Sequence, residues 1–532
     1  MSPELCEQTN KRQLQKIPPE QLSSELMRKL PLEFLKKQRA IPILLDKGEP
    51  AIALADPLNV EAYDAIVSIL GQPCRRVICP AAEIEQAISR CYYLGPGEEV
   101  NYLSPDRPEG KSGEPQNAPD VSSTVQTQAE DLLNIADKAP AIKLVNKILF
   151  HAVHSRASDI HIEPYEQEVK VRYRVDGVLR NVLTVPKRQI GPILSRLKIM
   201  ANLNIAEHRL PQDGQSRVSI GDGLVDIRVS VIPTAGGERV VLRLLDKGRG
   251  ELKLEDIGFG PHTLKTFRSL IGISHGIVLL TGPTGSGKTT TLYAALNELN
   301  SQERNILTVE DPVEYQLPGI GQMQVRPKIN LTFASCLRHI LRQDPDIIMI
   351  GEIRDRETAE IAIQASLTGH LVLSTLHTND AASAVTRLID MEIEPYLISS
   401  TVVGVMAQRL VRVICPECKQ LYDPEDGTVS WSELRKVTKG FVKLYKGTGC
   451  PKCLETGYLG RSGIFELLLV DDNIRDLIVR RQGSHLIKKA AVGNGMVTLR
   501  QYGLHRALAG LTTLEEVYRV TQDCVQVGRE VS

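Results

Sequence analysis

The sequence predicts an α/β protein built from several domains. Apolar strand-like segments alternate with helix-like segments from about residue 254 to residue 410, as expected for a parallel sheet covered by helices on both faces. Before this region, residues 168–175 and 225–231 alternate apolar and polar side chains, which is typical of strands in a half-exposed sheet. A chain of 532 residues is also too long for one hydrophobic core. We therefore expect a parallel α/β domain preceded by a smaller α+β domain.

A small α/β unit is expected at the N-terminus, over residues 1–94. Strands are predicted at 42–45, 51–54 and 75–79, with a helix between the last two. The unit contains no constellation of potential catalytic residues, so we interpret it as a docking domain. Residues 95–130 are rich in Pro, Gly, Ser and charged residues and lack aliphatic periodicity, which indicates a flexible linker.

The rest of the chain is divided by its periodicity and by its cysteines. The expected segments are a second α+β domain over 131–250, the parallel α/β domain over 251–412, a cysteine-bearing subdomain over 413–462 and a helical C-terminal subdomain over 463–532. The second domain is expected to begin with a helix at 141–150.

Charge and hydropathy exclude some classes of protein. Lys and Arg number 64 and Asp and Glu also number 64, so no excess of positive charge favours nucleic acid as the main partner. The first residues lack the basic and apolar regions of a signal peptide, and no stretch approaches the about 20 apolar residues of a membrane-spanning helix. We expect a cytoplasmic protein whose association with a membrane depends on a partner.

A phosphate-binding loop lies between a predicted strand at 276–280 and a predicted helix from residue 290. Its residues are Gly282, Pro283, Thr284, Gly285, Ser286, Gly287, Lys288 and Thr289, which match the pattern G-x-x-x-x-G-K-[ST] at every position. In such loops the backbone N–H groups cradle phosphates, the Lys reaches the β- and γ-phosphates and the Thr hydroxyl binds Mg²⁺. Glycine-rich turns also occur for packing reasons alone, but the register of Gly, Lys and Thr favours binding of a nucleoside triphosphate.

Three acidic residues follow predicted strands of the same domain. Glu310 and Glu314 come at and after the end of one strand, and Glu352 follows the apolar run 347–350. Phosphoryl transfer to water needs Mg²⁺ near the phosphates and a carboxylate that orients or deprotonates water, and the carboxyl ends of parallel strands lie beside the phosphate loop. We expect Glu352 to activate water or to support Mg²⁺. The alternative is that these acids cap the helices that follow.

Two arginines and two histidines are further candidates. Arg338 and Arg342 lie one turn apart on a predicted helix and could reach a phosphate or a neighbouring subunit, with surface ion pairs as the alternative. His370 and His377 both lie near a predicted strand. From spacing alone, each histidine is either a structural residue or a group that contacts the nucleotide.

Four of the ten cysteines form two C-x-x-C pairs, Cys415 with Cys418 and Cys450 with Cys453. Four thiolates in two such pairs suit a closed, tetrahedral Zn²⁺ site. The 31 residues between the pairs exceed the spacing of a zinc ribbon, about 15 to 20 residues, so the insert with Trp431 is expected to form a loop or a small lobe. A redox role is the alternative.

The motifs, in this order, resemble those of the secretion-ATPase superfamily of traffic ATPases and, within it, the type II secretion motors of the GspE family. The resemblance covers nearly the whole chain. It rests on segments 157–164, 209–214, 237–245, 282–289, 310–314, 341–346, 351–355, 368–377 and 408–412, together with the four cysteines.

This resemblance implies a RecA-like P-loop motor domain, a preceding PAS-like α+β domain and a homohexamer that binds ATP between these two domains. It implies that Lys288 and Thr289 hold phosphate and Mg²⁺ and that Glu352 is the catalytic acid at the end of the Walker B strand. The four cysteines would hold Zn²⁺.

The resemblance also assigns roles to residues that spacing leaves open. It places Glu310 and Glu314 in an acidic box, places His370 and His377 in a histidine box, and makes Arg209 and Arg228 candidates for contact with the phosphates, within or across a subunit boundary. Gln215 departs from the pattern, because many relatives have Arg there. That departure removes a charged contact expected at this position.

The partners follow from the resemblance alone. The N-terminal domain would bind the cytoplasmic domain of a GspL-like protein of an inner-membrane secretion platform, and the ring would act on a polytopic GspF-like protein. The motor would then drive assembly of a pseudopilus and export of folded proteins across the outer membrane, while remaining peripherally attached to the inner membrane through its partners.

Three other functions remain open on the sequence. A type IV pilus extension motor shares the cysteine site and the motor motifs. A nucleic-acid translocase needs the same phosphate loop, but it also needs a basic channel lined by aromatic residues, and aromatic residues are only 4% of this chain. A regulatory module that binds nucleotide without turnover is the third.

Overall fold

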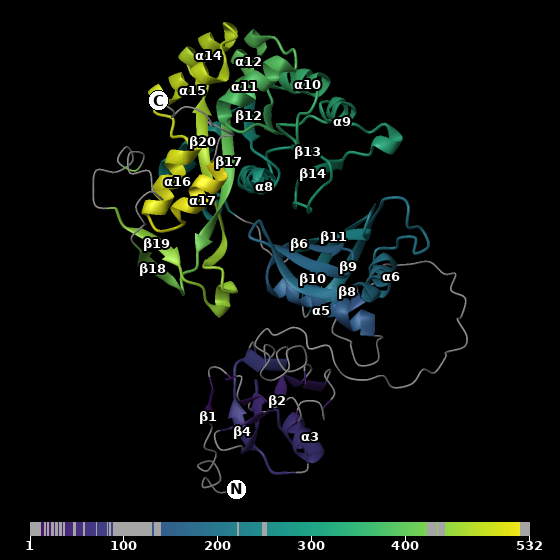
Figure 1. Ribbon diagram of the computed structural model, residues 1–532. Helices are drawn as coiled ribbons and strands as arrows, with labels where there is room; N and C mark the ends of the chain where they lie inside the picture. Colours follow the sequence, from purple (N-terminus) through teal and green to yellow (C-terminus); the bar gives the residue numbers. More distant parts are fainter. Residues whose placement is uncertain are drawn as a thin grey trace, which may run out of the picture. The chain divides into compact units, whose positions relative to one another are not determined.

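The computed structural model describes residues 140–220, 223–246, 253–422 and 442–521, together with parts of the segment from 12 to 88, residues 130–131 and residue 434. The predicted linker up to residue 129 and the insert residue Trp431 lie outside these residues. The chain divides into two compact units, Met1–Thr124 and Val125–Ser532. Figure 1 shows the elements of each unit.

The first unit contains a four-stranded sheet. Its order is β1-β4-β3-β2, formed by β1 (Arg12–Gln13), β2 (Ala40–Leu44), β3 (Pro50–Leu54) and β4 (Arg75–Ile78). Helix α3 (Val60–Leu70) follows β3 and packs against the strands through Ala62 and Ile66, which are buried. The predicted strands and helix therefore form, with ends shifted by one or two residues.

The second unit begins with a seven-stranded sheet of order β5-β9-β10-β11-β6-β7-β8. Its strands are β5 (Glu130–Asp131), β6 (Ala157–Pro164), β7 (Glu168–Val175), β8 (Val178–Pro186), β9 (Gln212–Ile220), β10 (Gly223–Thr234) and β11 (Gly237–Asp246). In β7 every second residue from Val169 to Tyr173 is buried, as the alternation predicts. Helices α5 (Pro140–His154) and α6 (Ile190–Met200) share one core with these buried residues.

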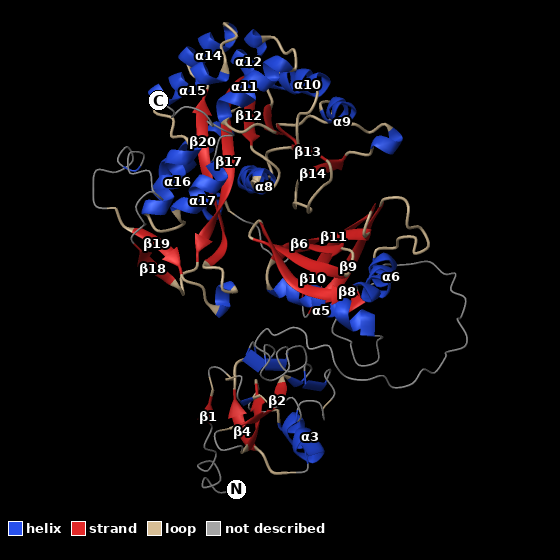
Figure 2. Cartoon of the chain, in the orientation of Figure 1, coloured by secondary structure: helices blue, strands red, loops and turns tan. Residues whose placement is uncertain are grey.

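The parallel domain contains a second seven-stranded sheet, of order β14-β13-β15-β16-β12-β17-β20. Figure 2 labels β12, β13, β14, β17 and β20 of this sheet. Its strands are β12 (Gly276–Thr281), β13 (Ile306–Glu310), β14 (Gly321–Gln324), β15 (Ile347–Ile350), β16 (Leu371–Leu376), β17 (Val402–Ile414) and β20 (Tyr458–Leu469). Strands β12, β15 and β16 are buried at every residue, because helices cover both faces of the sheet. All neighbouring strands are parallel except β17 and β20.

The helices of this domain connect consecutive strands or pack beside them. They are α7 (Pro261–Ile271), α8 (Lys288–Leu299), α9 (Phe333–Ile340), α10 (Arg356–Leu367), α11 (Ala381–Asp390) and α12 (Pro395–Thr401). Helix α8 begins directly at Lys288, so the phosphate loop connects the end of β12 to the start of this helix. This is the strand-loop-helix order that the loop requires.

The C-terminal part shares much of its core with the parallel domain, although Leu504, Ala507, Leu514 and Val517 pack in a separate cluster with Leu434 and Leu444. The boundary predicted between residues 462 and 463 falls inside β20, which pairs with β17 of the parallel domain. Helices α14 (Asp472–Val479), α15 (Ser484–Gly493) and α16 (Leu499–Leu508) bury side chains in the same core as β12 and β17, and α17 (Leu514–Thr521) contacts α16 and β17. Strands β18 (Lys419–Tyr422) and β19 (Leu444–Gly447) form a separate antiparallel pair near the cysteines.

Candidate nucleotide site

The phosphate loop adopts a conformation that requires glycine at three positions. Gly282, Gly285 and Gly287 have φ angles of +149°, +80° and +90°. A Cβ atom on Gly282 would lie 2.6 Å from the carbonyl oxygen of Gln408 on β17, so this glycine also allows close approach to the neighbouring strand. The loop is therefore shaped by both backbone conformation and packing.

Lys288 is the central cation of the loop. Its side chain is only 8% exposed, and its Nζ donates to the carbonyl oxygens of Gly282 at 2.6 Å and Pro283 at 3.3 Å. Burial lowers the pKa of Lys288 to about 8, against an opposing influence of the Glu352 carboxylate, while the charge of Arg409 lowers it further. Thr289, the next residue, is exposed and is available to bind a cation.

The lowered pKa of Lys288 predicts pH-dependent nucleotide binding. Above about pH 8 the free protein holds a neutral amine, and bound phosphate must restore its proton, so affinity for ATP should fall as pH rises through this value. The loss approaches about tenfold for each pH unit above the pKa. Calorimetric titrations in two buffers of different ionisation enthalpy should reveal the proton uptake. Lys288→Arg keeps its charge and should remove the dependence, whereas an equal slope in both proteins would contradict the prediction.

Gln408 and Arg409, which the resemblance included only as part of a segment, lie directly beside the loop. The buried Gln408 accepts a hydrogen bond from Thr291 of α8 at 2.9 Å. Arg409 donates through Nη2 to the carbonyl oxygen of Asn379 at 2.8 Å. Asn379 belongs to the loop after β16, so Arg409 joins that loop to the strand that flanks the phosphate loop.

Glu352 lies at the same edge of the sheet, after β15. It forms an ion pair with Arg354, and its Oε2 lies 3.2 Å from Nε2 of His377, which follows β16. Burial alone would raise the pKa of Glu352, but the hydrogen bond from Arg354 and the nearby His377 hold the pKa below its ordinary value. Glu352 is therefore ionised at neutral pH and close enough to Lys288 to raise the pKa of that lysine. The sequence pattern alone assigned no role to Arg354.

The two histidines of the predicted histidine box lie at opposite ends of β16. His370 precedes the strand, and its Nδ1 contacts the carbonyl oxygen of Ala365 at 2.8 Å and the hydroxyl of Thr368 at 3.1 Å. Only His377 lies at the edge that carries the phosphate loop. The structure brings His377 to Glu352 and places His370 at the amino end of the sheet.

The two acids of the acidic box have different surroundings. Glu310 is 3% exposed and accepts hydrogen bonds from Tyr293, Thr308 and Gln322. Glu314 lies at the surface and faces Arg228 of β10, with Oε2 3.4 Å from Nη1 of that arginine. Arg228 also donates to the carbonyl oxygen of Val313 at 3.2 Å, so this candidate arginine contacts the acidic box.

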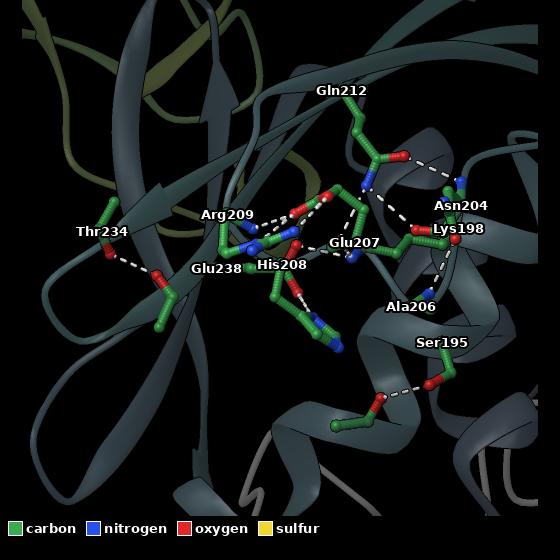
Figure 3. Close-up of polar contacts among 12 residues, drawn as sticks. Ser195, Lys198, Asn204, Ala206, Glu207, His208, Arg209, Gln212, Thr234 and Glu238 are labelled. Atoms are coloured by element: carbon green, nitrogen blue, oxygen red, sulfur yellow. Dashed lines mark hydrogen bonds and ion pairs between the residues drawn. The ribbon is translucent and has the colours of Figure 1, made fainter.

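Among the described residues, Arg209 forms no hydrogen bond or ion pair with the phosphate loop, and Figure 3 shows it beside Glu207. Its side chain is 89% exposed and pairs with Glu207. The segment around Arg209 is held in place by Lys198, which is 1% exposed. Nζ of Lys198 lies 2.6 Å from the Glu238 carboxylate and donates to the carbonyl oxygen of Glu207 at 2.7 Å. Lys198 therefore fixes the backbone near Arg209, while the Arg209 side chain itself points into solvent.

The arginines on the predicted helix before β15 form local contacts. Arg338 pairs with Glu357 at 2.6 Å, and Arg342 donates to the carbonyl oxygen of Arg338 at 2.7 Å. Arg338 therefore forms a surface ion pair, which the sequence allowed as the alternative. Arg342 lies beyond the end of α9 at Ile340, so the expectation that both arginines share a helix is wrong.

The four cysteines meet although 31 residues separate the pairs. Their sulfur atoms all lie within 4.8 Å of one another, with Sγ–Sγ distances of 3.8 Å between Cys415 and Cys450 and 3.9 Å between Cys418 and Cys453. A tetrahedral zinc with Zn–S bonds of about 2.3 Å sets its sulfurs about 3.8 Å apart. The donor set and its geometry therefore fit a metal ion.

Comparison with known proteins extends these observations to the whole chain. The family model described as "Type II/IV secretion system protein" matches residues 134–519, and the MshEN domain model matches residues 12–98. The chain is 47% identical over 507 residues to type II secretion system ATPase E of Vibrio cholerae serotype O1, covering 93% of this chain and 97% of that protein. It is 46% identical over 513 residues to type II secretion system protein E of Xanthomonas campestris pv. campestris, covering 96% and 88%.

A pilus motor is also similar. Type IV pilus assembly ATPase PilB of Myxococcus xanthus is 43% identical over 495 residues, covering 93% of this chain and 86% of that protein.

Solved structures share the fold at low sequence identity. The ATPase DotB of Legionella pneumophila matches with a TM-score of 0.53 and 20% identity, covering 74% of this chain and 98% of that one. DotB of Yersinia pseudotuberculosis matches with a TM-score of 0.54 and 21% identity, covering 77% and 99%. Within the described residues, no helix combines the length and apolar character needed to cross a membrane. With a phosphate loop on a RecA-like sheet and relatives that match nearly its full length, the chain belongs to the type II/IV secretion system protein family and is a type II secretion ATPase.

Proposed function

We propose that this chain hydrolyses ATP as the homohexameric motor of a type II secretion platform, with Glu352 as the residue that activates water. The observation that supports this role is the position of an ionised Glu352 at the sheet edge of the phosphate loop, paired with Arg354 and His377. A carboxylate there can orient or deprotonate water for attack on the γ-phosphate.

The other groups of the site bind and orient in this proposal. When ATP binds, Nζ of Lys288 would leave the carbonyl oxygens of Gly282 and Pro283 and donate to phosphate oxygens instead. The negative charge of the phosphates would offset the cost of burying the lysine charge. The exposed hydroxyl of Thr289 would hold Mg²⁺, which neutralises charge on the phosphates when bound. His377 keeps the Glu352 carboxylate in place. Arg228 and Arg209 are the candidates to approach the phosphates from the preceding domain, and His370 supports the far end of β16.

The metal of the cysteine site is proposed to be Zn²⁺. Four sulfur donors at tetrahedral spacing favour Zn²⁺ over oxygen-preferring cations such as Mg²⁺ or Ca²⁺. Four cysteine ligands fill the tetrahedral coordination shell and leave no position for a substrate, so the role of the metal is structural.

The proposed partners are those of a secretion platform. The MshEN-type N-terminal unit would bind the cytoplasmic domain of a GspL-like protein, and the motor would act on a GspF-like membrane protein while attached to the inner membrane only through partners. The relatives named type II secretion system ATPase E and type II secretion system protein E support this system. The pilus motor with 43% identity makes pilus assembly the second candidate.

Turnover of the purified chain tests this proposal. ATP hydrolysis should rise when the cytoplasmic domain of the cognate GspL-like protein is added, and Lys288→Ala should abolish both basal and stimulated turnover, because the loop loses its only lysine. Lys265→Ala, which removes an exposed lysine on α7, is the matched control and should keep wild-type turnover. Stimulation by a pilus platform alone would favour the second candidate, and stimulation by DNA alone would overturn both.

A further inference from the structure

The buried Glu310 is enclosed by hydrogen-bond donors. Its Oε1 accepts from the Thr308 hydroxyl at 2.6 Å and from Nε2 of Gln322 at 3.0 Å, and its Oε2 accepts from the hydroxyl of Tyr293. Thr308 and Glu310 lie two residues apart on β13, so they face the same side, and Gln322 pairs with Thr308 from β14. All three donors are neutral; Tyr293 and Thr308 are fully buried, and Gln322 is half-buried.

Tyr293 completes the network from the helix that follows the phosphate loop. It lies five residues after Lys288 on α8 and is fully buried. Its hydroxyl donates to Glu310 and accepts from the backbone N–H of Glu314 at 3.3 Å. Nε2 of Gln322 also lies 3.4 Å from this hydroxyl, but its two N–H groups have shorter contacts with Glu310 at 3.0 Å and with the carbonyl oxygen of Tyr315 at 3.2 Å. The single donor of the phenol is therefore committed to Glu310.

The same network determines the path of the chain after β13. The side chain of Gln322 accepts from the backbone N–H of Leu317 at 2.7 Å and donates to the carbonyl oxygen of Tyr315 at 3.2 Å. The ring of Tyr315 contacts the ring of Tyr293 edge to face, with centroids 4.7 Å apart. Residues 313–317 are therefore held at several points, and this segment presents Glu314 to Arg228.

We propose that Tyr293 and Glu310 are positioning residues that together hold segment 313–317, and that Glu310 does not face Mg²⁺ at the nucleotide. Glu310 acts through Tyr293 and Gln322, because both of its oxygens are occupied by protein donors. The network links the helix that starts at Lys288 to the segment that carries Glu314, so its loss displaces Glu314 and slows turnover without removing a phosphate or metal contact. This inference rests on the ATP hydrolysis proposed above.

A double-mutant cycle on the full-length chain separates this role from metal binding. Tyr293→Phe and Glu310→Gln should each lower kcat about tenfold and leave KM for ATP and the half-activating Mg²⁺ concentration within about twofold of wild type. The double variant should be no slower than the slower single variant, because both changes break one network. Tyr396→Phe and Glu360→Gln alter exposed residues and serve as matched controls.

Some outcomes would refute this inference, and another would refute the proposed ATP hydrolysis on which it rests. A rise of about tenfold in the half-activating Mg²⁺ concentration for Glu310→Gln, but not for Tyr293→Phe, would show that Glu310 serves the metal. Multiplicative losses in the double variant, or wild-type kcat in both single variants, would also refute the shared role. Hydrogen exchange gives a readout independent of turnover: amides of 313–317 should exchange faster in Tyr293→Phe than in wild type, and equal exchange would contradict the inference. Full activity of Lys288→Ala would instead refute the proposed function.

Discussion

Glu352→Gln should lower the ATP turnover of this chain by about 10² to 10⁴-fold while nucleotide binding is retained. Glutamine keeps the size of the side chain and can still contact Arg354 and His377, but it cannot take a proton and carries no charge. The ion pair with Arg354 and the contact with His377 keep Glu352 ionised in the wild type. Steady-state hydrolysis and equilibrium binding of a fluorescent ATP analogue measure the two effects separately.

The control for this substitution is Glu360→Gln, on the exposed side of α10. Glu360 pairs with Arg356 at the surface and should be replaced without loss of turnover. Equal, negligible turnover in wild type and Glu352→Gln would support a module that binds nucleotide without hydrolysis. Equal and substantial turnover in both proteins would assign water activation to another group.

Cys415→Ala should abolish stoichiometric metal binding and unfold the cysteine subdomain locally. Removing one of four thiolates opens the coordination shell, and the free energy of structural zinc binding is folding free energy, about 10 to 16 kcal/mol in zinc-finger peptides. The backbone nitrogens of Cys450 and Gly457 each donate to the Cys453 sulfur at 3.2 Å, so two backbone hydrogen bonds of the loop depend on this sulfur staying in place. Elemental analysis should give about one Zn²⁺ per wild-type chain and none in the variant.

Hydrogen exchange should locate the loss. Amides of β18 and β19 should exchange faster in Cys415→Ala, while those of β12 and β16, which lie in the core of the motor sheet, should stay protected. Cys336→Ala is the matched control, because it removes an equally buried thiol from α9. This variant should still bind metal at the four-cysteine site. Metal retained in Cys415→Ala, or a disulfide between the pairs in the purified protein, would contradict the structural zinc site and favour the redox alternative.

The groups whose chemistry depends on neighbours in sequence were predictable from sequence. The phosphate loop is a contiguous pattern between a strand and a helix, and the strand expected at 168–175 forms over those same residues as β7. The acid after an apolar run identified Glu352 because carboxyl ends of parallel strands share one edge. The two C-x-x-C pairs predicted a metal site because this short spacing within each pair is typical of zinc ligands.

Tertiary structure alone decided the arrangements that depend on strand order and strand ends. Six residues of β16 separate His370 from His377, and that length places them at opposite edges of the sheet, so only His377 meets Glu352. Pairing of β20 with β17 draws the C-terminal part into the motor core, because sheet neighbours need not be neighbours in sequence. The burial of Glu310 arises from the same cause: a strand-end acid looks alike in sequence whether its neighbours are water or the hydroxyl of Tyr293.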